Sequence, residues 1–147
     1  MKTAIIYYSE HHGNTRKVLE GIAAEHEVTL VDIMKEKAID LSGFDRIGIA
    51  SGIYYSSFAK QLLKYAQENL PEGKEVFFLG TCGSQRKGYF DAIKKITDAK
   101  NCKTLGEFTC LGFDTFGPFK LVGGIAKGHP TDEEIAQAVA FYAGLEK

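Results

Sequence analysis

The polar segment from residue 9 to residue 15 contains side chains that can bind a charged ligand. It follows the apolar run 3–8 and precedes a helical pattern, and its candidate binding residues are Ser9, His11, His12, Gly13, Asn14 and Thr15. Backbone N–H groups at a helix N-terminus can face an anion, and the helix adds a partial positive charge. Hydroxyl, amide and imidazole groups can donate further hydrogen bonds, so we interpret the segment as a phosphate-binding loop. An ordinary turn with Asn14 or Thr15 as N-cap, and with both histidines in solvent, also explains these residues.

Two common phosphate-binding motifs are absent from this segment. A GxGxxG fingerprint needs three glycines, and Gly13 stands alone. A Walker A loop needs lysine before its Ser or Thr, and Asn14 occupies that place. The pattern therefore favours a mononucleotide whose phosphate is fixed by hydrogen bonds. The two histidines do not predict a metal site, because no further ligands accompany them.

Alternating apolar runs and helical patterns predict the elements that position this loop. The five predicted strands are Thr3–Tyr8, Val28–Asp32, Arg46–Ala50, Glu75–Gly80 and Phe108–Gly112. Apolar residues at spacings of three and four predict helices around residues 18–23, 58–70, 89–96 and 135–142. Such alternation is typical of an α/β fold with a mostly parallel sheet and helices on both faces.

Two connections have their own signals. Thr131 and Glu134 have the spacing of a capping box and predict the start of the last helix. Residues 33–43 are too few for a full helix and two turns, so we expect a loop between the second and third strands. The Gly-rich stretch Gly112–His129 is the longest irregular segment, and its three phenylalanines can cover a ligand, form a protein contact or bury one another.

The sequence Tyr-Ser-x-x-x-Gly-Asn-Thr, from Tyr8 to Thr15, resembles the phosphate loop of the flavodoxin family, which binds FMN. The resemblance covers essentially the whole chain. It implies a flavodoxin-like three-layer sandwich with a five-stranded parallel sheet in the order 2-1-3-4-5, and FMN where the strand order reverses. Residues 1–147 are then a single flavodoxin-like domain. Glu10-His11-His12 departs from the small hydroxyl residues of many flavodoxins, and we expect Glu10 to point outward.

The resemblance also implies two segments that contact the isoalloxazine ring of FMN. After the third strand, an aromatic ring stacks on the flavin, and the residues there are Ser51, Gly52, Ile53, Tyr54 and Tyr55. After the fourth strand, backbone groups meet the pyrimidine edge, and the residues there are Thr81, Cys82, Gly83 and Ser84. The tyrosines can instead pack against the following helix. Cys82 is interpreted as structural, because no histidine or acid is tied to it by sequence.

Composition limits the classes of partner. The 147 residues carry 18 Lys+Arg and 19 Asp+Glu, for a net charge of −1, which excludes binding of nucleic acid through a basic patch. No apolar run reaches the length of a membrane span, and residues 1–10 do not resemble a signal peptide. Three cysteines without metal-binding spacing predict reduced thiols, and together these features predict a cytoplasmic protein.

Three functions are consistent with the sequence. The leading hypothesis is an FMN-binding redox protein that exchanges electrons with a redox partner protein or a small-molecule electron acceptor. An alternative is a quinone or porphyrinogen oxidoreductase, because Ser-Gly-Ile-Tyr-Tyr before a Phe-led helix resembles the menaquinone-dependent protoporphyrinogen oxidases. A flavin-free binding module is disfavoured, because a receiver domain needs an acidic pair after the first strand, where Tyr8-Ser9 stand. The near-neutral charge favours a partner that is not chosen by charge, and the oligomeric state is left open.

Overall fold

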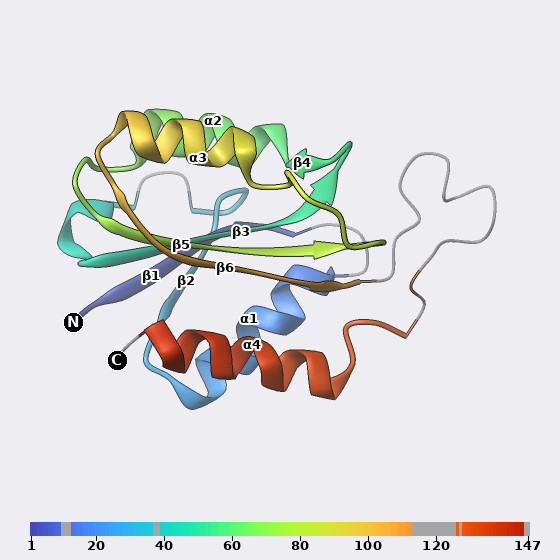
Figure 1. Ribbon diagram of the computed structural model, residues 1–147. Helices are drawn as coiled ribbons and strands as arrows, with labels where there is room; N and C mark the ends of the chain where they lie inside the picture. The colour runs from blue at the N-terminus through green and yellow to red at the C-terminus, as the bar shows by residue number, and fades with distance from the viewer. Residues whose placement is uncertain (10–12, 37–38, 113–125, 127, 146–147) are drawn as a thin grey trace.

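The computed structural model describes residues 1–9, 13–36, 39–112, 126 and 128–145 (Figure 1). The strands are β1 (Thr3–Tyr8), β2 (Thr29–Asp32), β3 (Arg46–Tyr54), β4 (Ser57–Phe58), β5 (Glu75–Cys82) and β6 (Lys103–Leu111). The helices are α1 (Asn14–Glu25), α2 (Lys60–Asn69), α3 (Asp91–Ala99) and α4 (Asp132–Leu145), with the 3₁₀ turn η2 at Leu41–Gly43.

One parallel sheet forms the middle layer of the molecule. Its strand order is β2-β1-β3-β5-β6, and the short β4 pairs with β3 in the antiparallel sense. Helices α1 and α4 lie against one face, and α2 and α3 lie against the other (Figure 1). With β4 set aside, this is the predicted order 2-1-3-4-5. The flavodoxin-like three-layer fold is confirmed.

Three predicted strand boundaries are wrong by two or more residues. β3 continues to Tyr54 rather than ending at Ala50, and β5 continues to Cys82 rather than Gly80. β6 begins at Lys103 instead of Phe108, because it is an edge strand whose first residues are exposed and polar and so lack an apolar run. Between β2 and β3 the described residues form only the turn η2 and shorter turns, as predicted for a loop.

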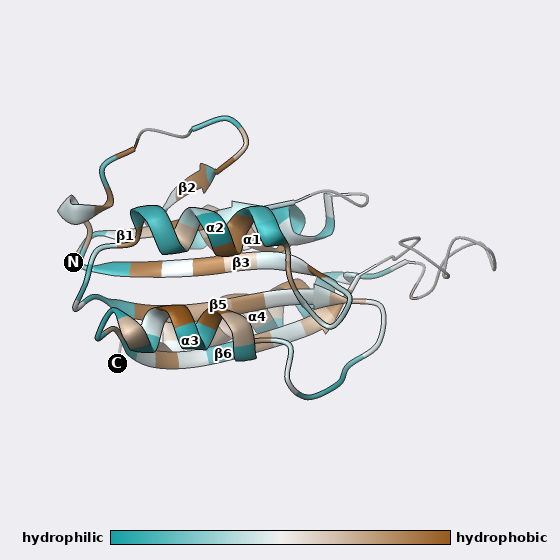
Figure 2. Cartoon of the chain, turned by 90° about the horizontal axis from the view of Figure 1, so that it is seen from above, coloured by the Kyte–Doolittle hydropathy of each residue, from teal (hydrophilic) through white to brown (hydrophobic). Residues whose placement is uncertain are grey.

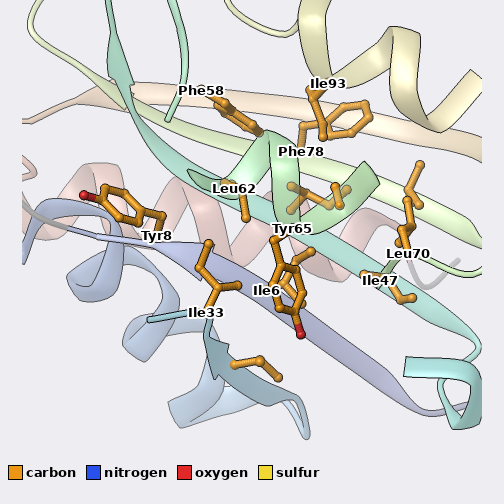
Figure 3. Packing of buried hydrophobic residues seen from close by; sticks show 14 of the residues in the cluster. Ile6, Tyr8, Ile33, Ile47, Phe58, Leu62, Tyr65, Leu70, Phe78 and Ile93 are labelled. Atoms are coloured by element: carbon orange, nitrogen blue, oxygen red, sulfur yellow. The ribbon is translucent and has the colours of Figure 1, made fainter. Parts of the chain in front are cut away.

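Apolar side chains fill both spaces between the sheet and its helices. On the α2/α3 face, Ile6 and Phe78 pack in one cluster with Leu62 and Ile93 (Figure 3). On the other face, Ile5 belongs to a cluster with side chains of α1 and α4. Adjacent strand residues such as Ile5 and Ile6 point to opposite faces, so a strand buried on both faces is apolar at every position. In Figure 2 the central strands β3 and β5 are mostly brown and white, in agreement with this pattern.

Helices α1 and α4 approach each other closely because a glycine lies at their contact. A Cβ atom on Gly21 of α1 would lie 2.3 Å from Cγ2 of Ile135 in α4, so any larger residue would force the helices apart. This contact fixes the position of α1 relative to the C-terminal helix. In the described part of the chain, no helix has the length and apolar character needed to cross a membrane.

Candidate functional site

The candidate site lies at the carboxyl edge of the sheet. The last residues of the four longest strands are Tyr8, Tyr54, Cys82 and Leu111. Because these strands are parallel, they all end at the same edge, which is on the right in Figure 1. The segments that follow β1, β3 and β5 are therefore neighbours, and all predicted site residues lie in or beside them.

The N-terminus of α1 has the features of an anion-binding site. Gly13 is the N-cap and adopts a left-handed conformation with φ 67°, so the proposal of Asn14 or Thr15 as N-cap is wrong. Gly13 has no capping side chain, and the Ser9 hydroxyl accepts the Arg16 N–H at 3.2 Å in its place. The first turn of α1 contains no acidic residue. Within that turn, no carboxylate neutralises the positive end of the helix.

A buried pair of hydroxyl groups joins α1 to β5. The Oγ1 atoms of Thr15 and Thr81 lie 2.9 Å apart, and both residues are buried. The Thr81 hydroxyl is thus used within the chain. The pair holds the start of α1 against the strand whose end carries the segment 81–84.

Asn14 packs against the residue that follows β6. A Cβ atom on Gly112 would lie 2.7 Å from Nδ2 and 2.9 Å from Cγ of Asn14, so position 112 admits only glycine without a shift. The Gly112 N–H donates to the Cys82 carbonyl at 2.8 Å. Sequence reasoning placed Gly112 only at a strand end. The feature of the sequence that could have indicated this contact is a glycine directly after an apolar strand, because glycine often marks a close approach of another group to the backbone.

The segment after Ala50 is a β-hairpin and not the loop expected from the sequence. Tyr54 pairs with Ser57, and the two residues between them, Tyr55 and Ser56, have φ of 49° and 64°. Two left-handed residues at the centre of a two-residue hairpin are the signature of a type I′ turn. The prediction failed because β4 gives the end of β3 a pairing partner that its apolar pattern does not reveal.

Ser51 holds this hairpin in place. It is fully buried, its hydroxyl donates to the Gly52 carbonyl at 2.6 Å, and it accepts the Ala59 N–H at 3.1 Å. The hydroxyl connects β3 to the residue that precedes α2. Ser51 therefore supports the site from within the fold, and Ile53 lies beside it in the hairpin with its side chain near Gly80.

The structure separates the two adjacent tyrosines. The Tyr54 ring meets the Tyr8 ring edge-on, with centroids 6.0 Å apart, and its hydroxyl would lie 3.3 Å from a Cβ on Gly52. Tyr55 is 80% exposed at the tip of the hairpin. Both line a pocket of ≈ 460 Å³ together with Tyr8 and the first residues of α2. Tyr54 therefore packs within the chain, and Tyr55 presents its ring to solvent.

Residues 83–90 connect the end of β5 to the start of α3. Cys82 is buried, and its thiol donates to the Cys110 carbonyl at 3.5 Å. Gly83 and Ser84 follow it half-exposed, and the Ser84 carbonyl accepts the Tyr89 hydroxyl at 2.5 Å. Burial, with Glu134 and Cys82 nearby, raises the pKa of Cys110 to about 12, so its thiol stays protonated.

Some residues named in the sequence analysis lie outside the described part of the chain. These are Glu10, His11 and His12, and residues 113–125 of the Gly-rich segment. Among the residues that are described, no three His, Cys, Asp or Glu side chains gather in a way that could hold a metal ion.

The chain was compared with known proteins. A family model described as "Flavodoxin domain" matches residues 5–109. The chain belongs to the flavodoxin domain family. An uncharacterized protein of Methanocaldococcus jannaschii is 33% identical over 149 residues, covering 100% of this chain and 99% of that protein. The resemblance stated from residues 8–15 is therefore confirmed.

Solved structures share the fold of this flavodoxin domain. Oxidised Flavodoxin 1 from Bacillus cereus matches with a TM-score of 0.73 and 17% identity, covering 99% of this chain and 97% of the other. A flavoprotein in complex with FMN from Lactobacillus acidophilus NCFM matches with a TM-score of 0.56 and 23% identity, covering 74% of this chain and 92% of the other. At these identities the similarity establishes the three-layer architecture.

Proposed function

We propose that this flavodoxin domain binds FMN and transfers electrons, as a single domain spanning residues 1–147. The observation that carries the proposal is the N-terminus of α1, which starts at a left-handed glycine and has no acidic residue in its first turn. This helix follows β1, and the strand order reverses between β1 and β3. In open α/β sheets that reversal is where a ligand binds. Family membership and the FMN complex of the Lactobacillus acidophilus relative support the choice of ligand.

The phosphate of FMN would be held at the N-terminus of α1. Ser9, Asn14 and Thr15 lie at or just before that end of the helix and carry hydroxyl or amide groups, and His11 and His12 belong to the same segment of the sequence. A Cβ built on Gly13 meets no atom of the described residues within 4 Å. Neutral donors at a helix N-terminus fit a dianion without a lysine.

The isoalloxazine ring would lie between the β3–β4 hairpin and the segment 81–84. Tyr55 is the exposed aromatic side chain on the hairpin, and Gly52, Ile53 and Tyr54 shape the strand behind it. The backbone of Thr81, Cys82, Gly83 and Ser84 would contact the polar edge of the ring. Small residues in this segment allow the close approach that such backbone hydrogen bonds require.

FMN supplies the redox chemistry, and the protein binds it, orients it and limits its contact with water. No side chain of the chain is needed as an acid or base in this proposal. The electrons pass to a redox partner protein or a small-molecule acceptor. A net charge of −1 gives the chain little long-range field, so we expect association with the partner to depend weakly on salt.

The visible spectrum of the purified protein tests the proposal. We expect absorption bands of bound flavin, or their appearance when FMN is added to the colourless protein. Asn14→Ala and Thr15→Ala should each weaken FMN binding by about 1–2 kcal/mol, the range for hydrogen bonds to a charged group. Asn69→Ala is the matched control, because Asn69 ends α2 and donates to the Tyr65 carbonyl at 3.1 Å.

Two results would contradict this proposal. A colourless protein that takes up no added FMN would exclude flavin binding. Equal FMN affinity in the Asn14, Thr15 and Asn69 variants would place the phosphate elsewhere. Steady-state turnover with a quinone acceptor, measured against electron transfer to a redox protein, then separates an oxidoreductase from a carrier.

A further inference from the structure

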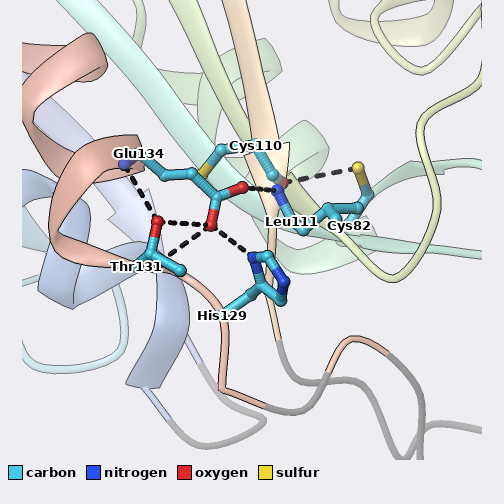
Figure 4. A network of polar contacts seen from close by, with 6 residues as sticks. All are labelled: Cys82, Cys110, Leu111, His129, Thr131 and Glu134. Carbon is cyan, nitrogen blue, oxygen red and sulfur yellow. Dashed lines mark hydrogen bonds and ion pairs between the residues drawn. The ribbon is translucent and has the colours of Figure 1, made fainter.

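Glu134 does more than cap the helix to which it belongs. As the capping-box residue of α4, its N–H donates to the Thr131 hydroxyl at 3.1 Å, and its Oε1 accepts the Thr131 N–H at 2.9 Å (Figure 4). These two bonds complete the capping box predicted from the sequence. The carboxylate makes two further contacts that a helix cap does not need, with the Leu111 backbone and with His129.

The contact with Leu111 connects α4 to the end of the edge strand. The Leu111 N–H donates to Oε2 of Glu134 at 3.2 Å, whereas the next amide, Gly112 N–H, donates to the Cys82 carbonyl of β5 at 2.8 Å. Successive N–H groups of a strand point to opposite sides, so the Leu111 N–H points away from β5. Glu134 gives this amide a partner where β6 has no neighbouring strand.

The contact with His129 fixes the direction of the carboxylate. Nδ1 of His129 lies 2.5 Å from Oε1 of Glu134. The side chain of Glu134 is 15% exposed. Burial on its own would raise the pKa of Glu134, but hydrogen bonds from Thr131, His129 and Leu111 and the attraction of His129 bring it below its ordinary value. The ionised carboxylate is therefore the form that bridges α4 and β6.

Leu111 is directly followed by the residue on which Asn14 packs. Gly112 is thus held from two sides, by Cys82 of β5 and, through the preceding residue, by Glu134 of α4. Asn14 is buried against it, with Nδ2 2.7 Å from the position of a Cβ on Gly112. A displacement of Gly112 would therefore change the space that the Asn14 side chain occupies.

From this chain of contacts we infer that Glu134 is a positioning residue for Asn14, in the first turn of α1, acting through Leu111 and Gly112. The inference rests on the proposed function, because it assigns Glu134 a role at the same binding site. Glu134 touches no ligand in this arrangement. It sets where the end of β6 lies, and the end of β6 sets where Asn14 lies.

Glu134→Gln tests the inference, with Glu133→Gln as the matched control. Glu133 is exposed in the same first turn of α4, so both changes remove one charge near the same helix end. We expect FMN affinity to fall about tenfold in Glu134→Gln, within the range for coupled neighbouring residues, and to stay unchanged in Glu133→Gln. Thr131→Ala removes the cap hydroxyl alone and should lower thermal stability with less effect on FMN affinity.

A double-mutant cycle distinguishes positioning from general destabilisation. If Glu134 acts through Asn14, then Asn14→Ala combined with Glu134→Gln should bind FMN no more weakly than Asn14→Ala does alone. Additive losses, or equal affinity in Glu134→Gln and Glu133→Gln, would overturn the inference. Should Glu134→Gln not fold, Glu134→Asp keeps the charge but is too short to reach both Thr131 and Leu111, and the same outcomes apply.

A readout without FMN separates this inference from the proposed function. In the FMN-free protein, Glu134→Gln should speed hydrogen exchange of the Leu111 amide and shift the NMR signals of the Asn14 side-chain NH₂, whereas Glu133→Gln should do neither. Unchanged exchange and shifts overturn the inference whether or not the protein binds FMN. If wild type binds no FMN but these changes occur, the proposed function fails and the connection between Glu134 and Asn14 stands.

Discussion

The two sides of the candidate site use left-handed backbone in different ways. At the start of α1, the left-handed residue is Gly13, and the side chains that follow it are buried against β5 and Gly112. At the β3–β4 hairpin, the left-handed residues are Tyr55 and Ser56, and Tyr55 is 80% exposed. A non-glycine residue in this conformation costs roughly 1–2 kcal/mol. The backbone at the start of α1 is thus relaxed and held by side-chain packing. The backbone at the hairpin is strained and held by its turn.

Different contacts hold the two sides of the candidate site in place. The hydroxyl pair of Thr15 and Thr81 is formed between elements of the fold and exists before a ligand binds. The hairpin depends on the two hydrogen bonds of Ser51 and on the pairing of β3 with β4. Changes at the first side should therefore affect stability and binding together, whereas changes at the hairpin tip should affect them separately.

The largest effect is expected at Gly112. Gly112→Ala places a Cβ within 2.7–3.0 Å of three Asn14 atoms, so stability should fall by about 1–3 kcal/mol, as in overpacked interiors, and FMN affinity should fall with it. Urea unfolding and FMN titration measure the two effects. Gly144→Ala is the control, because its Cβ meets nothing within 4 Å and should not destabilise α4. A Gly112→Ala protein as stable as wild type would refute tight packing at this side.

The hydroxyl pair should have the next largest effect. Thr81→Val keeps the shape of the side chain but leaves the buried Thr15 hydroxyl without its partner, so we expect a loss of about 1–3 kcal/mol in the free energy of unfolding. Thr15→Val with Thr81→Val should cost less than the sum of the single changes, because no hydroxyl is then left unpaired. Additive losses in chemical denaturation would show that the two hydroxyl groups do not interact.

At the hairpin tip, binding and stability should change independently. Tyr55→Ala should weaken FMN binding by about 1 kcal/mol, as expected for loss of an aromatic stacking contact. Stability should change by no more than about 0.5 kcal/mol, because the ring is largely exposed. Tyr54→Ala should instead lower stability, since its ring contacts Tyr8. If an FMN titration shows that Tyr54→Ala binds FMN more weakly than Tyr55→Ala does, then Tyr54 and not Tyr55 is the stacking ring.

The smallest effect is expected at Ser56, and it is a gain in stability. Ser56→Gly should raise the free energy of unfolding by up to about 1 kcal/mol, because glycine relieves a left-handed φ of 64° and this gain exceeds its entropic cost. Asn101→Gly, at φ 58°, should gain less, since asparagine tolerates this conformation better. Thermal unfolding measures the stability of the two variants. A Ser56→Gly protein less stable than wild type would mean that the hairpin is not strained.

The sequence predicted the elements whose patterns are local. Continuous apolar runs located β1 and β5, and the Thr131–Glu134 spacing located the start of α4. The same method missed the first half of β6, because an exposed edge strand needs no apolar residues. It ended β3 four residues early, because the pairing of Tyr54 with Ser57 depends on a turn of two residues that are not typical of hairpins.

The sequence indicated the segments of the candidate site but not the contacts that hold those segments in place. The residues of the α1 N-terminus were found because polar side chains there follow an apolar strand. The contact of Gly112 with Asn14 and of Glu134 with Leu111 joins residues far apart in the chain, and no local pattern records it. Ser51 makes two internal hydrogen bonds that support the hairpin, which the sequence did not predict, and its contact with a ligand stays a prediction.

The close approach of Gly21 to Ile135 also has a consequence for the order of events during synthesis. Helix α1 leaves the ribosome early, but the helix that packs on its glycine is made from the last residues of the chain. At about 5–20 residues per second, the interval between them is several seconds. During that interval one side of α1 is uncovered and exposes its apolar residues to the surrounding solution. The face of α1 that carries Gly21 is thus covered only after the residues of α4 have been made.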